Sequence, residues 1–227
     1  MKDDVVVITG GLGQLGRAAA EAARARGART ALVDFASEPA QPPEADLHLY
    51  GVDLTDPAAA ERAMKAVRER LGRLDVLLNI AGGFSWETLD GGDPRTWEKM
   101  FALNLKTAVN ATRAALPHLL AGGAGRVVNV GAAGAVKAAA GMGPYAASKA
   151  GVMRFTEALA EELKTKDVTV NAVLPSIIDT PQNRADMPEA DPGKWVTAAD
   201  LAAVMLFLGS REARAVTGAL LPVTGRV

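Results

Sequence analysis

Tyr145 and Lys149 lie four positions apart in the segment YAASK, a spacing that places both side chains on one face of a helix. A free tyrosine loses its proton near about pH 10, so it transfers protons near neutrality only when a neighbouring group stabilises the phenolate. The ammonium of Lys149 can provide that stabilisation. The pair therefore predicts general acid–base chemistry, although an isolated Y-x-x-x-K also occurs on exposed helix faces.

A second hydroxyl is missing from the stretch before this pair. The fifteen residues from Val130 to Pro144 contain no Ser, Thr or Tyr. Removing one preorganised donor from a developing oxyanion costs about 10²- to 10³-fold in rate. Three explanations remain open: Ser85 or Ser176 supplies the hydroxyl from a loop, the substrate disperses its own charge, or the site has lost catalysis.

The segment TGGLGQLG contains glycines in G-x-G-x-x-G spacing directly after a short apolar run and before a helical pattern. Such glycines let the backbone turn tightly and approach a pyrophosphate, which then lies at the helix N-terminus. The alternative is a glycine-rich turn without a ligand. The residues expected to bind the cofactor here are Gly10, Gly11, Gly13, Gln14, Leu15 and Gly16.

Asp34 ends the second apolar run, eighteen positions after Gly16. A carboxylate there can accept hydrogen bonds from both hydroxyls of an adenosine ribose and would repel a 2′-phosphate. The sequence therefore favours NAD, with NADH preferred, over NADP. Arg17 keeps NADP as a minor alternative, and an ordinary carboxylate at a strand end is the other interpretation.

Apolar runs of strand length alternate with Ala-rich segments of helical period, the pattern of βαβ units on a parallel sheet covered on both faces. We predict a single-domain α/β Rossmann fold over residues 1–227, with a doubly wound seven-stranded parallel sheet. The predicted strands are 5–9, 29–34, 47–53, 75–81, 125–130, 168–174 and 218–224. The predicted helices are 14–26, 57–71, 94–120, 145–164 and 198–209.

Two segments fit neither element type, Gly82 to Asp93 and Pro175 to Trp195. Each follows a predicted strand, and right-handed crossovers place the carboxyl ends of all the strands at one edge of the sheet. We therefore expect both segments to lie over that edge as mobile or lid-like substrate loops.

Composition excludes several classes of function. The 25 Lys and Arg nearly balance the 26 Asp and Glu, so no broad basic field for nucleic acid or an anionic membrane is expected. The chain has no Cys and only two His, which makes a metal centre improbable and removes thiolate chemistry. No signal peptide or membrane-spanning stretch is evident, so a cytoplasmic protein is expected.

The order and spacing of several motifs resemble the short-chain dehydrogenase/reductase family over essentially the whole chain. These motifs are TGGLGQLG, VDLTD, NIAGG, FALNL with Asn104, YAASK and LPSIIDT. Gln14 departs from the family's usual glycine pattern, which affects the local loop shape. The resemblance implies a small-molecule substrate, hydride transfer with NAD, and pairing of helices 94–120 and 145–164 in homodimers or homotetramers.

The same resemblance implies a role for each matching position. Asn104 would hold a water against Lys149 and complete a catalytic set with Tyr145, unless it is a plain helix residue. Lys149 would also hold the nicotinamide ribose. The other residues implied to line the nucleotide site are Asp53, Leu54, Asn79, Ala81, Gly82, Pro175, Ile178 and Thr180.

The family's usual serine would lie thirteen residues before Tyr145, where this chain has Ala132. Within the family, the C-terminal half resembles the dihydropteridine reductases, which use NADH and lack that serine. A quinonoid pterin spreads the incoming charge over its ring nitrogens and needs only Tyr145. The candidate substrate-binding residues are Phe84, Trp86, Ala132, Met142 and Ser176.

An alternative from another functional class is an NADH-binding redox sensor on the same fold with little or no turnover. The intact set of Tyr145, Lys149 and Asn104 argues against a loss of catalysis. Binding of NADH without oxidation by any acceptor would support the sensor.

Overall fold

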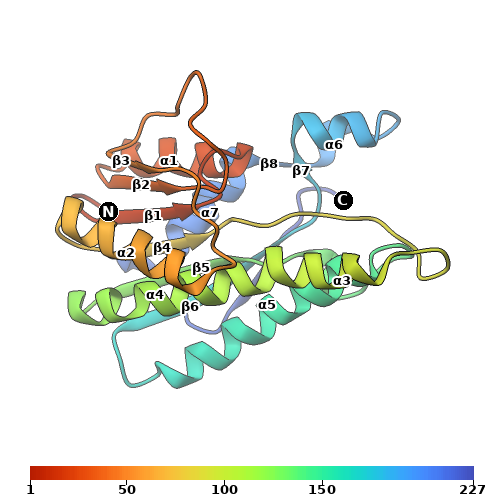
Figure 1. Cartoon of the computed structure of the whole chain (residues 1–227). Helices are drawn as coiled ribbons and strands as arrows, with labels where there is room; N and C mark the ends of the chain where they lie inside the picture. The colour runs from red at the N-terminus through yellow and green to blue at the C-terminus, as the bar shows by residue number, and fades with distance from the viewer.

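Seven parallel strands form the central sheet, in the order β3-β2-β1-β4-β5-β6-β9 (Figure 1). The computed structural model describes all residues from 1 to 227. The strands are β1 (Val5–Thr9), β2 (Arg29–Val33), β3 (Leu47–Leu49), β4 (Val76–Asn79), β5 (Gly125–Val130), β6 (Val168–Pro175) and β9 (Leu220–Val223). Strand order reverses beside β1, which lies between β2 and β4, as in a doubly wound sheet.

The central strands consist of apolar runs because both faces of the sheet are covered. Every residue of β1 and β5 is buried. Val7 lies opposite Ala31 of β2 on one side and Leu77 of β4 on the other. Each strand therefore contributes side chains to two cores, one on each face of the sheet.

Two helices cover one face of the sheet and three cover the other (Figure 1). Helices α1 (Gln14–Ala25) and α7 (Ala198–Leu208) pack together on the first face. The second face carries α2 (Pro57–Leu71), α4 (Thr107–Gly122) and α5 (Gly143–Glu162). This confirms the predicted single-domain α/β Rossmann fold with helices on both faces.

Helix boundaries follow local signals in the sequence. The carboxylate of Asp56 accepts hydrogen bonds from the backbone N–H groups of Ala58 and Ala59, and Pro57 fills the first position of α2. Gly72 ends this helix in the left-handed conformation, at φ +77°.

The segment predicted as one helix over 94–120 is divided in three. It comprises α3 (Pro94–Met100), a π-helical turn (Phe101–Lys106) and α4. A π-helical turn contains an additional residue, so the side chains after it are rotated relative to a continuous α-helix. The hydrophobic period alone predicted a single helix, and this prediction was wrong.

The segment 175–195 contains more regular structure than expected. A small second sheet pairs β7 (Ile178–Asp179) with β8 (Val196–Thr197), and α6 (Pro181–Asp186) lies between them. The hydroxyl of Thr180 accepts a hydrogen bond from the Asn183 N–H and so caps α6. Short 3₁₀ turns occur at 133–135, 192–194 and 211–213.

None of the helices is both long enough and apolar enough to cross a membrane.

Candidate active site

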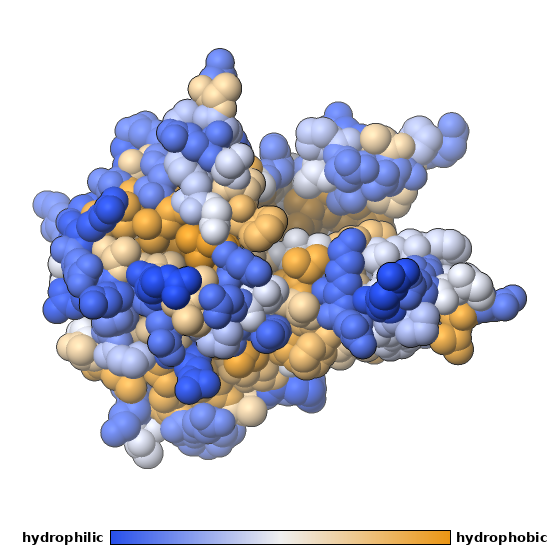
Figure 2. Space-filling model, viewed as in Figure 1, coloured by the Kyte–Doolittle hydropathy of each residue, from blue (hydrophilic) through white to orange (hydrophobic).

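A large cleft, about 1480 Å³ in volume, runs along the carboxyl ends of the strands. Figure 2 shows a recess with a hydrophobic floor beside the segment that carries α6. Of the predicted site residues, the cleft is lined by Gly10, Gly13, Gln14, Leu15, Gly16, Asp34, Asp53, Leu54, Ala81, Gly82, Phe84, Trp86, Ala132, Met142, Tyr145, Lys149, Pro175, Ser176, Ile178 and Thr180. Residues from segments far apart in the sequence therefore meet at one edge of the sheet.

Gly11, Asn79 and Asn104 do not line this cleft. Gly11 packs on β2, because an added Cβ would lie 2.7 Å from the Cβ of Leu32. The buried side chain of Asn79 donates hydrogen bonds to Thr112 Oγ1 and Asn129 Oδ1, each at 2.8 Å. The structure thus uses the side chain of Asn79 to join β4, β5 and α4, rather than presenting it to the cleft.

The glycine loop between β1 and α1 has no room for larger side chains. Gly10 has φ +66°, and an added Cβ would lie 2.9 Å from the Ala81 nitrogen. An added Cβ on Gly16 would overlap the carbonyl oxygen of Gly10. Helix α1 begins after Gly13 without a side-chain cap, so its first N–H groups are available to an anion. This loop fits the pyrophosphate of a dinucleotide.

Asp34 is held rigidly at the carboxyl end of β2. Its Oδ2 accepts a hydrogen bond from the Leu12 N–H at 2.9 Å, and its Oδ1 accepts one from the Ala36 N–H at 3.0 Å. The carboxylate therefore faces the cleft beside the glycine loop, as the NAD prediction requires. Phe35 next to it lines the cleft with 74% of its surface exposed, a residue that the sequence interpretation missed.

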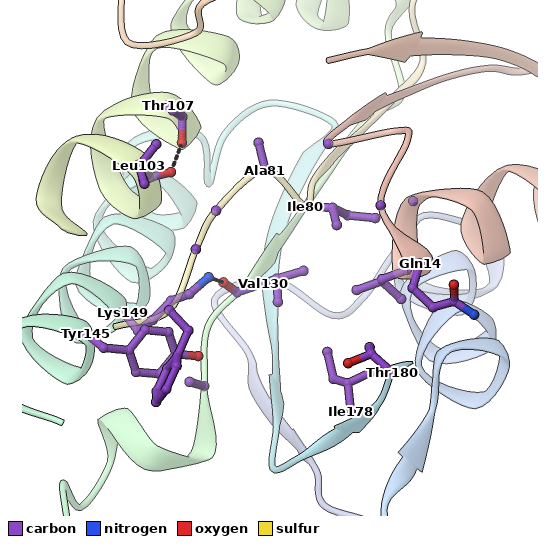
Figure 3. A pocket seen from close by; sticks show the side chains of 18 of the residues that line it. Gln14, Ile80, Ala81, Leu103, Thr107, Val130, Tyr145, Lys149, Ile178 and Thr180 are labelled. Atoms are coloured by element: carbon purple, nitrogen blue, oxygen red, sulfur yellow. Dashed lines mark hydrogen bonds between the residues drawn. The ribbon is translucent and has the colours of Figure 1, made fainter. Parts of the chain in front are cut away.

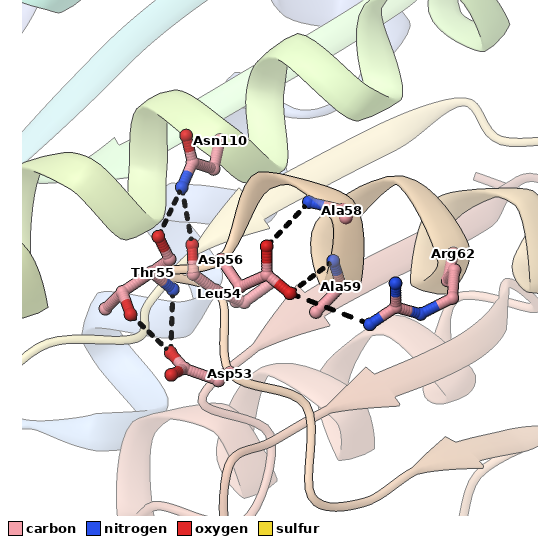
Figure 4. Close-up of polar contacts among 8 residues, drawn as sticks. All are labelled: Asp53, Leu54, Thr55, Asp56, Ala58, Ala59, Arg62 and Asn110. Carbon is pink, nitrogen blue, oxygen red and sulfur yellow. Dashed lines mark hydrogen bonds and ion pairs between the residues drawn. The ribbon is translucent and has the colours of Figure 1, made fainter.

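A network of polar contacts fixes the wall formed by Asp53 and Leu54 (Figure 4). Asp53 Oδ1 accepts hydrogen bonds from the N–H and the hydroxyl of Thr55, at 2.8 and 2.7 Å. Asn110 on α4 donates to the carbonyl oxygens of Leu54 and Thr55, at 2.9 and 3.2 Å. Asn110 was not predicted, because α4 contains several other polar residues and nothing in its sequence distinguishes this one.

Lys149 and Tyr145 come from the first turns of α5 and face the cleft together (Figure 3). The ammonium of Lys149 is buried and donates a hydrogen bond to the Val130 carbonyl at 2.7 Å. Burial lowers the pKa of Lys149 to about 8. The same cause raises the pKa of Tyr145 to about 12, and the Phe84 ring packs edge-on against it, 4.9 Å between centroids.

These pKa values differ from the expectation that Lys149 stabilises the phenolate. Burial alone accounts for the raised pKa of Tyr145, and the phenol is protonated in the neutral range. In this form Tyr145 can donate a proton.

Asn104 lies behind the cleft and joins two of its walls. Its Oδ1 accepts a hydrogen bond from the Gly83 N–H at 2.8 Å, and its Nδ2 donates to the Gly83 carbonyl at 3.0 Å. The same amide donates to Ser148 Oγ at 2.9 Å, and Ser148 donates to the Tyr145 carbonyl. Asn104 and the Lys149 ammonium flank Gly82, where an added Cβ would lie 2.5 and 3.4 Å from them.

Of the two serines that could replace the missing hydroxyl, only Ser85 has a hydroxyl that is not already hydrogen-bonded within the chain. Ala132 is buried and lines the cleft, with only a methyl group where a donor would act. The hydroxyl of Ser176 donates to the Thr224 carbonyl at 2.7 Å, so its proton is already used. Ser85 lines the cleft half-buried, and no group within the chain holds its hydroxyl.

The segment after β7 contributes three residues that the sequence interpretation treated only as part of a loop. Asn183 and Asp186 on α6 line the cleft, and so does Met187 directly after that helix. The polar character of this segment gave no signal for which of its residues face inward.

Comparison with known proteins identifies the type of chain. The family model described as short chain dehydrogenase matches residues 4–191. The 3-oxoacyl-(acyl-carrier-protein) reductase FabG of Vibrio cholerae is 30% identical, over 99% of this chain and 97% of the relative. The meso-2,3-butanediol dehydrogenase of Serratia marcescens is 33% identical, over 97% of this chain and 93% of the relative.

Solved structures agree with the sequence relatives. The carveol dehydrogenase from Mycobacterium avium in complex with NAD superposes with a TM-score of 0.87 at 29% identity, covering 99% of this chain and 97% of that one. Levodione reductase gives a TM-score of 0.89 at 29% identity, with the same coverage. The particular resemblance to dihydropteridine reductases is not shown by these relatives.

Proposed function

The chain belongs to the short chain dehydrogenase family and is an NAD-dependent oxidoreductase, and from this premise we propose that it uses NADH to reduce a small carbonyl-type acceptor. Bound NADH supplies the hydride. Tyr145 would supply the proton to the acceptor oxygen, so that a ketone, one hydride from NADH and one proton yield a secondary alcohol and NAD⁺. Lys149 keeps its ammonium beside the cleft, and Asn104 holds Gly83 and Tyr145 in register.

The observation that carries this proposal is the placement of Tyr145 and Lys149 together on the cleft, in the half away from Asp34. With its pKa raised to about 12, Tyr145 holds its proton at any physiological pH. Reduction requires this form of the enzyme, whereas oxidation of an alcohol requires the phenolate. A protonated Tyr145 on the cleft supports the reduction that we propose.

Two kinds of acceptor fit a site that lacks a hydroxyl at position 132. An ordinary ketone would need a second donor, and Ser85 is the candidate because its hydroxyl is unengaged. A quinonoid ring such as a dihydropterin would need none, because it disperses the incoming charge. The names of the relatives, such as levodione reductase and meso-2,3-butanediol dehydrogenase, favour a carbonyl and alcohol pair.

The test is a panel of acceptors with NADH and the purified protein. Small diketones, cyclic diketones, a β-ketoacyl ester and quinonoid dihydropterin are compared by loss of NADH absorbance. We expect turnover with at least one diketone, and Tyr145→Phe should lower it by about 10²- to 10⁴-fold. Preferential turnover of dihydropterin would support the quinonoid acceptor, and NADH binding without any oxidation would support a redox sensor.

A cytoplasmic location and a homodimeric or homotetrameric state are further parts of this proposal.

A further inference from the structure

We infer that Trp86, resting on Gly141, closes the outer end of the substrate half of the cleft and restricts the acceptor to a compact, uncharged and largely apolar molecule. The inference rests on the proposed reductase function and adds a substrate class to it. It makes Trp86 a residue that determines specificity.

Trp86 bridges two loops that are far apart in the sequence. Its Nε1 donates a hydrogen bond to the Ala140 carbonyl at 3.0 Å. The neighbouring N–H of Glu87 donates to the Gly141 carbonyl at 2.7 Å. One loop follows β4 and the other follows β5, so these two bonds join the two sides of the cleft mouth.

Glycine is the only residue type that leaves room for the Trp86 indole at position 141. Gly141 has φ +77°, a conformation that side chains with a Cβ rarely adopt. An added Cβ would overlap the five-membered ring of Trp86. The indole therefore lies directly on the glycine backbone, and this contact depends on both residues.

The loop that carries Trp86 is braced rather than loose. The carboxylate of Glu87 accepts hydrogen bonds from the Asp93 N–H and from the Thr96 hydroxyl, the latter at 2.8 Å. These contacts tie the loop to the start of α3. The loop is thus fixed on both sides of Trp86: before it, Gly83 is hydrogen-bonded to Asn104, and after it, Glu87 is hydrogen-bonded to Thr96 of α3.

The walls between Trp86 and the acid–base pair are mainly apolar. Phe84 packs against Tyr145, while Ala132 and Met142 also line this half. The ionisable side chains that line the whole cleft are Asp34, Asp53, Tyr145, Lys149 and Asp186. Asp34 and Asp53 lie at the nucleotide end, and the ammonium of Lys149 is already bonded to Val130.

The charges in this half therefore exclude an anionic substrate. Apart from Lys149 no cation lines the cleft, and the remaining ionisable group near the mouth is the carboxylate of Asp186. A phosphate or carboxylate on the substrate would be desolvated without a partner. A long acyl chain on a carrier would also have to pass the indole of Trp86. The site fits a neutral ring ketone better than such a chain.

The experiment measures relative kcat/KM for two probes with NADH: camphorquinone, a compact cyclic diketone, and a long-chain β-ketoacyl thioester of N-acetylcysteamine. The wild-type protein should prefer camphorquinone. Trp86→Ala should shift the ratio towards the thioester by about tenfold or more, the usual scale of discrimination by a hydrophobic wall. Gly141→Ala should shift it in the same direction, because its new methyl group displaces the indole.

Two further variants separate this explanation from a general disturbance of the loop. Trp86→Phe keeps a ring on Gly141 without the hydrogen bond and should retain most of the wild-type preference. Leu89→Ala removes another exposed apolar side chain of the same loop, 86% exposed and outside the cleft, and should leave the ratio unchanged. Binding of NADH, followed by its fluorescence, checks that each variant is folded.

Three outcomes are decisive. A shifted ratio in both Trp86→Ala and Gly141→Ala supports the inference. A wild-type preference for the thioester, or an unchanged ratio in variants that bind NADH normally, overturns it while leaving the reductase function intact. A wild-type protein that binds NADH but reduces neither these probes nor the wider panel contradicts the proposed function itself.

Discussion

At the scale of single residues, burial rather than charge pairing sets the chemistry of the site. Lys149 has its pKa lowered to about 8, and Tyr145 has its pKa raised to about 12, both by desolvation. The protein therefore keeps an ammonium in an apolar setting at neutral pH, at a cost in stability. That cost is expected where function, rather than folding, selects a residue.

Replacing Lys149 by Met should show this cost. The unfolded chain binds a proton on Lys149 up to about pH 10.5, whereas the folded chain releases it near pH 8, so the penalty is present below pH 8 and is relieved between these values. We expect Lys149→Met to raise the free energy of unfolding at pH 7 by about 1 to 3 kcal/mol while activity is lost. Urea unfolding at pH 7 and pH 10 measures the difference in free energy of unfolding between the variant and the wild type. This difference should be smaller at pH 10, and equal differences at both pH values would contradict the lowered pKa of Lys149.

Asp34 governs the choice of nucleotide. Its carboxylate is fixed by the N–H groups of Leu12 and Ala36, so it cannot turn away from a 2′-phosphate. Asp34→Ala should weaken NADH binding and lower the ratio of the affinities for NADH and NADPH by about 10-fold or more. A change of this size is expected when one charge-assisted hydrogen bond is lost. Fluorescence titration with both nucleotides measures the change. Equal affinities for NADH and NADPH in the unmodified protein would refute the role given to Asp34.

Ala132 distinguishes the two kinds of acceptor. A restored hydroxyl in Ala132→Ser helps only where an oxyanion needs a donor, so reduction of a ketone should rise by up to about 10²-fold. Reduction of a charge-dispersing quinonoid ring should stay level or fall. Steady-state kinetics on both substrates decide, and Ser85→Ala alone should lower ketone turnover if Ser85 is the present donor. No gain with any ketone would leave the quinonoid acceptor as the better explanation.

At the scale of elements, the π-helical turn at 101–106 is what brings Asn104 to Gly83 and Ser148. The amide holds the backbone of one loop and the start of α5 at once. Asn104 thus acts as a positioning residue, since it touches neither the cleft nor the phenol directly.

Asn104→Ala should therefore lower kcat more than it raises KM. We expect about a 10- to 100-fold fall in kcat, because Tyr145 and Phe84 lose their fixed separation. The fluorescence of bound NADH should be retained, which separates mispositioning from misfolding. Asn104→Asp keeps the acceptor for the Gly83 N–H and should recover part of the rate; an unchanged kcat in Asn104→Ala would dismiss the positioning role.

Most of the elements could be predicted from the sequence because they depend on local signals. Buried strands such as β1 read as continuous apolar runs, and Asp56 with Pro57 marks the start of a helix. The residues around TGGLGQLG and YAASK were predicted for the same reason. The division of 94–120 accompanies a contact between side chains 44 residues apart, Asn104 and Ser148, and the hydrophobic period gave no sign of it.

The sequence also did not predict which residues in and after α6 line the cleft, or that Trp86 packs on Gly141. Met187 faces the cleft only because Thr180 starts a helix and β7 pairs with β8. Trp86 finds Gly141 across 55 positions of sequence. Contacts of this kind are tertiary, and they include the residues that select a substrate.

At the scale of the whole molecule, an outer strip of large apolar side chains remains exposed. Trp97, Phe101 and Leu120 lie along the α3 to α4 segment with 43%, 55% and 40% of their surfaces exposed. We propose that this segment and α5, whose pairing the sequence predicts, form a surface between copies of the chain.

Light scattering at micromolar concentration should therefore give a dimer or a tetramer. Phe101→Glu should shift the distribution towards monomer, because a carboxylate would be buried unpaired at the contact. Leu221→Glu, which places the same charge at an exposed position on β9, is the matched control and should leave the distribution unchanged. A monomer in the unmodified protein would refute the expected assembly.

The placement of β9 also has a consequence during biosynthesis. Residues 220–223 pair with β6, and the Thr224 carbonyl accepts a hydrogen bond from the Ser176 hydroxyl, so one wall of the cleft is supported by residues that are synthesised long after the glycine loop. The glycine loop and Asp34 are made about two hundred residues earlier. The residues of the phosphate-binding turn are therefore synthesised long before those of β9, and the parallel strands must wait for partners that are distant in the sequence.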